Sequence, residues 1–463
     1  MFDKETYIRR RRTLAGKLAA TAPEGKRGIV AFLGNVDAPA QYKANGYKFR
    51  QDSSWLYYFG IDEPRFAAIL DLDAGTETLF SDDYGIDDII WTGPMPSVSS
   101  LAAGVGIAAS APYAGFEAAV KAAQAQGRPV HTLPPSRWYN TLRFRELGLT
   151  APSVDLVRAV VSMRLVKEPQ ETARIDAACD LGQRMHSIGR DAIRVGIVEQ
   201  DIVGKMEGFA LAHGWGVSFP TILTQHGEIF HNHSHECVIA PGKLMVIDAG
   251  VEANDHYASD FTRTYPTGGR FTARQRDIYT LVYECNELAF GLIRPGTPYR
   301  EVHLAVARHM LEGLKALGLV GGDVDEMVAA GVAGLFMPHG LGHNMGLDVH
   351  DMEDLGEDLV GYDDDQKRSP QLGLGSLRMA RRLVPGNVIT DEPGIYFIPA
   401  LIEKWKEDGT NAEYVRFDRL EAYYGFGGIR LEDDVLVTPD GACRLGPNRL
   451  PIAPDDIEAV MNQ

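Results

Sequence analysis

An aspartate stands inside a segment that otherwise has the composition of a buried β-strand, the run VIDAGV at residues 246–251. An ionised carboxylate is costly to bury alone, so Asp248 requires a cation or a metal ion beside it. Asp260 follows in a second strand-like segment after a polar turn. If the two strands form a hairpin centred on Asn254, Asp248 and Asp260 face each other with Cβ atoms about 4.5–5.5 Å apart. This arrangement predicts a metal site, and an ion pair of Asp260 with Arg263 or another nearby cation is the alternative.

A Pro-Gly pair precedes two of the acidic residues at the same distance. Gly242 lies six residues before Asp248, and Gly386 lies six residues before Glu392. An apolar run separates each glycine from its acid, which is typical of a turn that leads into a strand. The pattern predicts two related halves, each of which supplies a carboxylate, although Pro-Gly turns before strands are common. Another acid, Glu432, is also flanked by strand-forming residues.

Three histidines, His339, His343 and His350, lie close together in a glycine-rich segment. The spacing of the first two also occurs in helical zinc proteases. Those proteases need a helix and a glutamate directly after the first histidine, whereas here the residues between are Gly-Leu-Gly. The segment therefore indicates a polar site in a loop rather than a helical zinc site.

The length of 463 residues predicts two domains, because chains beyond about 250–300 residues usually divide their core. Residues 1–160 alternate short strand-like runs with alanine-rich helical stretches, which is typical of an α/β domain. We expect the boundary near residue 160 and a larger domain over 161–463. Near the N-terminus, the basic run Arg9–Arg12 lies in an amphipathic helical pattern, and we expect it on a solvated helix face.

Charge and cysteine usage exclude several classes of partner. The chain has 46 Lys and Arg against 63 Asp and Glu, a net charge of −17, which argues against nucleic acid and anionic membranes. We find no apolar run of about 18 residues and no apolar export segment at the N-terminus. The four cysteines are far apart in the sequence, which is typical of reduced thiols in a cytoplasmic protein.

The motifs IDAG, SDFTRT, HGLGH with GLDVHD, EPGIYF and GGIRLEDD occur in this order over residues 161–463. This set resembles the pita-bread dinuclear metallopeptidases, in particular prolidase (Xaa-Pro dipeptidase) and aminopeptidase P (Xaa-Pro aminopeptidase). Residues 49–60 resemble the smaller N-terminal domain of the same enzymes. The resemblance implies an α+β fold in which a pita-bread catalytic domain with pseudo-twofold halves follows a smaller α/β domain. It also implies a homodimer whose partner closes the site.

The resemblance further implies two divalent metal ions per subunit, with Asp260 and Glu432 bridging them. The implied ligands are Asp248, Asp260, His343, Glu392 and Glu432. Four carboxylates and two divalent ions give a neutral cluster that can activate a water molecule. A set rich in oxygen with one imidazole favours Mn²⁺, with Co²⁺, Zn²⁺ and Fe²⁺ as alternatives.

The implied reaction is hydrolysis of the bond before proline, in Xaa-Pro dipeptides or short Xaa-Pro peptides. That bond is a tertiary amide without an N–H, so it suits a dedicated enzyme. Glu392 would transfer the proton and His231 would stabilise the tetrahedral intermediate. The remaining implied site residues are His350 near the proline pocket, His339 as an orienting residue, and Arg430 beside the ligands and substrate. Phe219 stands where the family often has tyrosine, so a hydrogen bond to the cluster is missing.

The choice between dipeptidase and aminopeptidase depends on how the substrate ends. Arg378 lies fourteen residues before Glu392, as does the arginine of prolidases that binds the free carboxylate of proline. This favours the dipeptidase, although Arg381 or Arg382 could take the role and an aminopeptidase P remains the alternative. More remote alternatives are a metal-free binding protein or a creatinase-like enzyme on the same fold. A mononuclear iron oxygenase needs two histidines and one carboxylate, which fits poorly.

Overall fold

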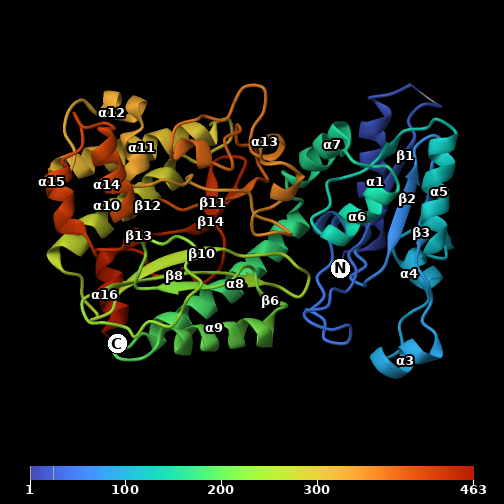
Figure 1. Cartoon of the computed structure of the whole chain (residues 1–463), viewed down its shortest axis with the longest axis horizontal. Coiled ribbons are helices and arrows are strands. Elements are labelled where there is room, and N and C mark those ends of the chain that lie inside the picture. Colours follow the sequence, from blue (N-terminus) through green and yellow to red (C-terminus); the bar gives the residue numbers. More distant parts are fainter. Residues whose placement is uncertain (1, 24, 463) are drawn as a thin grey trace. The chain divides into compact units, whose positions relative to one another are not determined.

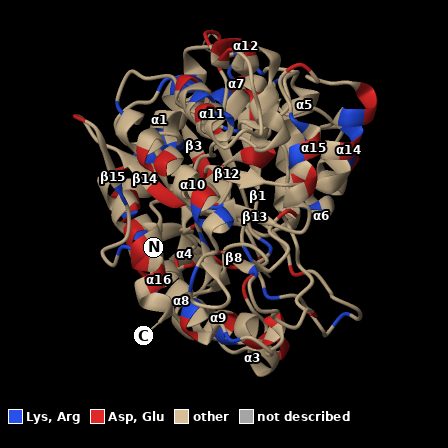
Figure 2. Ribbon diagram, turned by 90° about the vertical axis from the view of Figure 1, so that its left-hand side faces the viewer, with Lys and Arg blue, Asp and Glu red and all other residues tan. Residues whose placement is uncertain are grey.

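The computed structural model describes residues 2–23 and 25–462 and divides into two compact units (Figure 1). The first unit comprises the residues up to Arg164 together with Asp354–Leu359, and the second comprises Leu165–Glu353 and the residues from Val360 onward. Over the described ranges, no helix is both long enough and apolar enough to cross a membrane. The acidic residues are spread over helices of both units, including α3, α12 and α16 (Figure 2).

The first unit is built on a five-stranded mixed sheet in the order β4-β3-β2-β1-β5. Strand β2 is antiparallel to β1 and β3, while β1 with β5 and β3 with β4 are parallel pairs. The strands are β1 (Ile29–Leu33), β2 (Ala67–Asp71), β3 (Thr76–Phe80), β4 (Ala109–Ala111) and β5 (Val130–His131). The helices are α1 (Lys4–Ala19), α2 (Ser53–Phe59), α3 (Ile86–Thr92), α4 (Val98–Gly104), α5 (Ala114–Ala125), α6 (Trp138–Glu146) and α7 (Val154–Arg164).

The prediction that the basic run of α1 is solvated is wrong for its two central members, Arg10 and Arg11, which are buried. Arg10 donates to the carbonyl of Tyr57 over 3.0 Å, and Arg11 donates to the carbonyl of Tyr58 over 3.0 Å and pairs with Glu77 at 2.9 Å. These carbonyls belong to the last turn of α2, where a helix leaves carbonyl groups without partners of its own. The two arginines thus satisfy a buried helix end.

The second unit contains two three-stranded sheets, β10-β8-β7 and β11-β14-β15, and two strand pairs, β12-β13 and β6-β9. Its strands are β6 (Gly216–Val217), β7 (Ile222–Thr224), β8 (Leu244–Ala249), β9 (Val251–Glu252), β10 (Phe261–Pro266), β11 (Val388–Asp391), β12 (Gly394–Tyr396), β13 (Gly428–Arg430), β14 (Asp433–Val437) and β15 (Ala442–Arg444). Its helices are α8 (Pro169–Ala192), α9 (Glu199–His213), α10 (Ala273–Leu292), α11 (Tyr299–Ala316), α12 (Val324–Ala330), α14 (Pro399–Asp408), α15 (Phe417–Leu420) and α16 (Pro454–Met461). The short helix α13 spans Glu357–Val360.

The long helices of the second unit begin at local signals. Helix α8 has Pro169 at its start, where a missing N–H costs nothing, and Glu171 accepts from the backbone N–H of Glu168 at 3.0 Å. Helix α10 begins with a capping box, in which Thr272 and Gln275 exchange side-chain and backbone hydrogen bonds. Figure 1 shows α8 and α9 on one side of strands β8 and β10, with α10 and α11 beyond the other side.

The two halves of the second unit repeat one strand arrangement, as the Pro-Gly pattern predicts. Gly242 and Gly386 both adopt left-handed backbone conformations, with φ of 72° and 91°, which glycine adopts without strain. The first turn leads into β8, which pairs with β10, and the second leads into β11, which pairs with β14; both pairs are antiparallel. The expected pseudo-twofold α+β architecture is confirmed.

The predicted register of the first hairpin is wrong by two residues on the second strand. Asp248 faces Thr262 rather than Asp260, because the turn is centred on Asp255 and not on Asn254. Within this turn, His256 takes a left-handed backbone conformation with φ of 70°. Asp260 is consequently a diagonal neighbour of Asp248 on the same face, at a Cα separation of about 7–8 Å, which still allows a shared metal site.

Candidate active site

Asp248 is the second-last residue of β8, which is buried throughout, and Asp260 immediately precedes β10. Both are buried, and Oδ1 of each has no hydrogen-bond partner among the described residues. The backbone N–H of Asp260 donates to Oδ2 of Asp434 over 2.9 Å, which fixes the start of β10. Arg263 does not neutralise Asp260 as the alternative required; it binds Asp433 at 2.6 Å.

The second half supplies Glu392 at the end of β11 and Glu432 just before β14. The backbone N–H of Glu432 donates to the carbonyl of Thr262 over 3.0 Å, and its Oε2 accepts from the hydroxyl of Thr262 at 2.6 Å. Thr262 therefore joins the two halves beside the acids. The backbone N–H of Glu392 donates to the carbonyl of Leu341 over 2.9 Å. This bond connects Glu392 to the histidine loop, the glycine-rich segment 339–350.

His343 lies in that loop without a surrounding helix, as expected. Its backbone N–H donates to the hydroxyl of Thr390 over 3.0 Å, and its Nδ1 lies 3.1 Å from the carbonyl of Asn344. The carbonyl fixes the proton on Nδ1, so Nε2 is the atom available as a ligand. Nε2 lies 3.4 Å from Oδ2 of Asp260 and 3.8 Å from Oε1 of Glu392.

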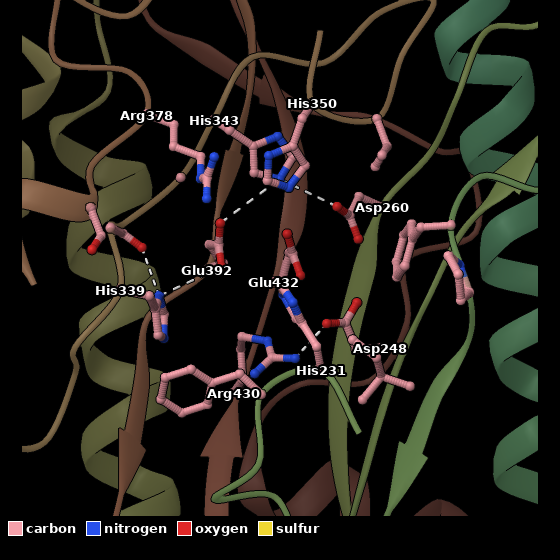
Figure 3. A pocket seen from close by; sticks show the side chains of 18 of the residues that line it. His231, Asp248, Asp260, His339, His343, His350, Arg378, Glu392, Arg430 and Glu432 are labelled. Atoms are coloured by element: carbon pink, nitrogen blue, oxygen red, sulfur yellow. Dashed lines mark hydrogen bonds and ion pairs between the residues drawn. The ribbon is translucent and has the colours of Figure 1, made fainter. Parts of the chain in front are cut away.

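The acids and His343 converge from both halves on one space (Figure 3). One ligand atom from each of Asp260, His343 and Glu432 lies within 4.8 Å of the others. Glu392 lies beside this triad and Asp248 is held next to it by Arg430. The structure thus brings the five candidate ligands together, with three of them in the tightest group.

The electrostatics of this cluster suit a divalent cation. Burial raises the pKa of Asp260 and of Glu432 well above the usual range, and the charge of neighbouring carboxylates adds to the effect. Burial likewise raises the pKa of Glu392. The unpartnered Oδ1 atoms of Asp248 and Asp260 would each cost about 1–3 kcal/mol if left unsatisfied. A divalent ion satisfies these atoms and offsets the repulsion, so the donor set fits a metal site.

Arg430 is buried beside the cluster and donates hydrogen bonds to three residues around it. Its Nη2 donates to Oδ2 of Asp248, its Nε donates to the hydroxyl of Thr262 over 3.1 Å, and its Nη1 donates to the hydroxyl of Tyr396 over 2.9 Å. The same hydroxyl lies 2.9 Å from Nε2 of His339. Tyr396 thus connects His339 to Arg430. The sequence motif EPGIYF contains this tyrosine, but the strand pattern alone gave no reason to assign it to the site.

The cluster opens into a pocket of about 530 Å³ that contains the other candidate residues. Its lining includes His231, His339, His350, Arg378 and Phe219. The ring of His350 stacks on that of His343, with centroids 3.8 Å apart and an interplanar angle of 16°. Burial lowers the pKa of His339 to about 3, so this ring is neutral near pH 7.

Of the three arginines near Ser376, Arg378 alone lines the pocket among the described residues. Arg378 is partly exposed and forms an ion pair with Glu353. Arg381 donates to the carbonyl of Val360 over 2.7 Å, and Arg382 donates to the carbonyl of Gly296. Glu353 was not among the predicted site residues, because nothing in its local sequence distinguishes it from a surface acid.

Taken together, a two-halved α+β domain, a buried carboxylate and imidazole cluster and a polar pocket define a metal-dependent hydrolase. Residues 173–439 match Metallopeptidase family M24, and residues 7–131 match the Aminopeptidase P, N-terminal domain. The chain belongs to metallopeptidase family M24.

Relatives of both predicted kinds cover nearly the whole chain. Human Xaa-Pro dipeptidase is 31% identical over 94% of this chain and 88% of its own length. The Xaa-Pro aminopeptidase of Escherichia coli strain K12 is 30% identical over 99% of this chain and 98% of its own length. The solved structure of aminopeptidase PepP from Pseudomonas aeruginosa covers 100% of this chain and 98% of that chain, with 27% identity and a TM-score of 0.80. These similar identities identify the family without separating the two activities.

Proposed function

We propose that this protein is an exopeptidase that hydrolyses the Xaa-Pro bond, with Xaa-Pro dipeptides as the favoured substrates. The observation that carries the proposal is that Arg378, a partner for a free carboxylate, lines the same pocket as the acid and histidine cluster. Within the chain, we assign catalysis to residues 161–463 and a supporting role to the smaller domain at 1–160.

Asp248, Asp260, His343, Glu392 and Glu432 would hold two divalent ions, with Asp260 and Glu432 shared between them. The proposed metal is Mn²⁺, because the donor set is rich in oxygen. The alternatives are Co²⁺, Zn²⁺ and Fe²⁺. When bound, such ions supply Lewis-acid polarisation and lower the pKa of a water molecule. Elemental analysis of the purified protein tests the stoichiometry: about two ions per chain support the assignment, and a protein that binds no divalent ion contradicts it.

The chain's own residues perform the proton transfers. Glu392 accepts the proton released by the attacking water and delivers it to the proline nitrogen as the C–N bond breaks. Burial raises the pKa of Glu392, which favours proton uptake by this carboxylate. His231 and His350 line the pocket and would donate hydrogen bonds to the oxygen of the tetrahedral intermediate. His339 and Arg430 would orient Glu392 and Asp248.

The variant Glu392→Gln tests this assignment. It keeps the shape of the side chain but cannot carry the proton, so we expect kcat to fall by about 10²–10⁴-fold. Metal content is measured on the same sample. A variant that retained its metal and near wild-type turnover would contradict the role of Glu392.

An Xaa-Pro aminopeptidase is the second candidate, and one observation favours it. Arg378 is already paired with Glu353, so it is not a lone positive charge waiting for a substrate carboxylate. Rates for a Gly-Pro dipeptide and for a tetrapeptide that begins Gly-Pro distinguish the candidates. Fast cleavage of the tetrapeptide alone would replace the dipeptidase proposal by the aminopeptidase.

The protein would act as a homodimer in the cytoplasm. Helix α3 exposes Ile86 by 70%, Ile90 by 68% and Trp91 by 86%, which makes a compact apolar surface suited to a second copy. Light scattering after chromatography tests the dimer, and Trp91→Ser should shift the mass towards that of one chain. The exposed thiol of Cys443 suits a reducing compartment.

A further inference from the structure

Glu353 contacts two residues of the substrate pocket with its two carboxylate oxygens. Its Oε2 lies 2.5 Å from Nδ1 of His350, and its Oε1 forms an ion pair with the guanidinium of Arg378. His350 and Arg378 both line the pocket, and they come from different loops. One carboxylate therefore holds the proposed donor to the intermediate and the proposed carboxylate anchor in a single arrangement.

The ion pair changes the charge that a substrate meets at this end of the pocket. The side chains of Arg378 and Glu353 are 36% and 28% exposed, so the two charges act on each other in a partly screened environment. A guanidinium that is already paired attracts a second carboxylate less strongly than an unpaired one. Glu353 also repels a free carboxylate directly, whereas a peptide that continues beyond proline carries no charge at that position.

We propose that Glu353 is a specificity-determining residue that weakens the preference for a free proline carboxylate and so admits peptides extended beyond proline. The inference rests on the proposed Xaa-Pro activity and deepens it. Specificity here is a difference between two affinities, set by an attractive residue, Arg378, and a repulsive residue, Glu353, at the same position. Through its second oxygen, Glu353 also orients His350, which affects both kinds of substrate equally.

The test compares kcat/KM for Gly-Pro with kcat/KM for a tetrapeptide that begins Gly-Pro. In Glu353→Gln and in Glu353→Ala, we expect the dipeptide-to-tetrapeptide ratio to rise about fivefold, mainly through a lower KM for the dipeptide. Glu353→Asp keeps the charge and should stay near the wild-type ratio. The surface variant Asp364→Asn removes the same charge from a fully exposed side chain in the segment after α13 and should not change the ratio.

A double-mutant cycle assigns the effect to the ion pair. In an Arg378→Gln background, Glu353→Gln should no longer raise the ratio. An unchanged or lower ratio in both neutral variants would overturn the inference, as would an equal rise without Arg378. A loss of kcat common to both substrates, with the ratio unchanged, would mean that Glu353 only orients His350. If the wild-type protein cleaved neither peptide, the proposed function would fall first and this inference with it.

Discussion

Lys167 and Asp351 form a buried ion pair, in which Nζ lies 3.0 Å from Oδ2 and each side chain is 2% exposed. Asp351 directly follows His350, and the backbone N–H of Lys167 donates to the carbonyl of Gly386 over 2.8 Å. Gly386 belongs to the turn that leads into β11 and Glu392. A single lysine far from the pocket motifs thus connects the histidine loop to the strand that carries the proposed proton carrier.

The variant Lys167→Met should destabilise the protein strongly. It removes the lysine that pairs with the buried carboxylate of Asp351, and breaking a buried ion pair costs about 3–5 kcal/mol. Urea denaturation measures the free energy of unfolding. The double variant Lys167→Met with Asp351→Leu removes both charges and should recover part of the loss. A single variant as stable as the wild type would show that the pair contributes little.

The variant Gly342→Ala should weaken metal binding. A Cβ atom there would lie 2.2 Å from the backbone oxygen of Thr390, so the loop that carries His343 must move away from β11. Displacing a ligand's support typically costs 10-fold or more, and about tenfold weaker binding is expected in a titration against a chelator. Gly441→Ala is the matched control, because its Cβ meets no atom within 4 Å. Equal affinity in the two variants would refute the prediction.

The variant Tyr396→Phe should reduce both activity and stability. It removes the hydroxyl between His339 and Arg430, so both residues lose an orienting contact. We expect kcat/KM for an Xaa-Pro peptide to fall about tenfold, with a loss of about 1–3 kcal/mol in the free energy of unfolding. Tyr424→Phe removes an exposed hydroxyl that contacts Glu403 and should leave kcat/KM unchanged. A Tyr396→Phe enzyme of full activity would exclude the orienting role.

The buried imidazole of His303 should make stability depend on pH. Burial lowers its pKa from 6.5 to about 4, with the charge of Arg300 acting in the same direction. Between these values the unfolded chain binds the proton and the folded chain does not, so stability is present above pH 6.5 and is lost as the pH falls. The wild type should lose about 2 kcal/mol relative to His303→Gln between pH 7 and pH 5. Urea denaturation of both proteins at these pH values checks this; parallel profiles would contradict it.

The candidate metal ligands could be predicted from local sequence motifs. The site and core residues that were not predicted depend on contacts between residues distant in the sequence. An acidic residue inside an apolar strand can be recognised from the sequence, because a buried carboxylate requires a partner. Ligand atoms of three of the five candidates do lie within 4.8 Å of one another. The register of Asp248 and Asp260 depends on the conformation of the turn between the two strands, in which His256 is left-handed, and the polar sequence of the turn does not specify that conformation. The roles of Tyr396 and Arg10 arise from partners 57 and 47 residues away, so their own neighbours in the sequence could not reveal them.

The candidate ligands from Asp248 to Glu432 span 184 residues of chain and come from both strand pairs. A chain that is still being synthesised has only Asp248 and Asp260 when its first strand pair is complete, because His343, Glu392 and Glu432 have yet to be made. The full set of candidate ligands is therefore complete only after the second strand pair has been made and has docked onto the first. Without a bound ion, the two halves would still be joined by the hydrogen bond from Thr262 to Glu432, but the charges of their facing carboxylates would not be offset.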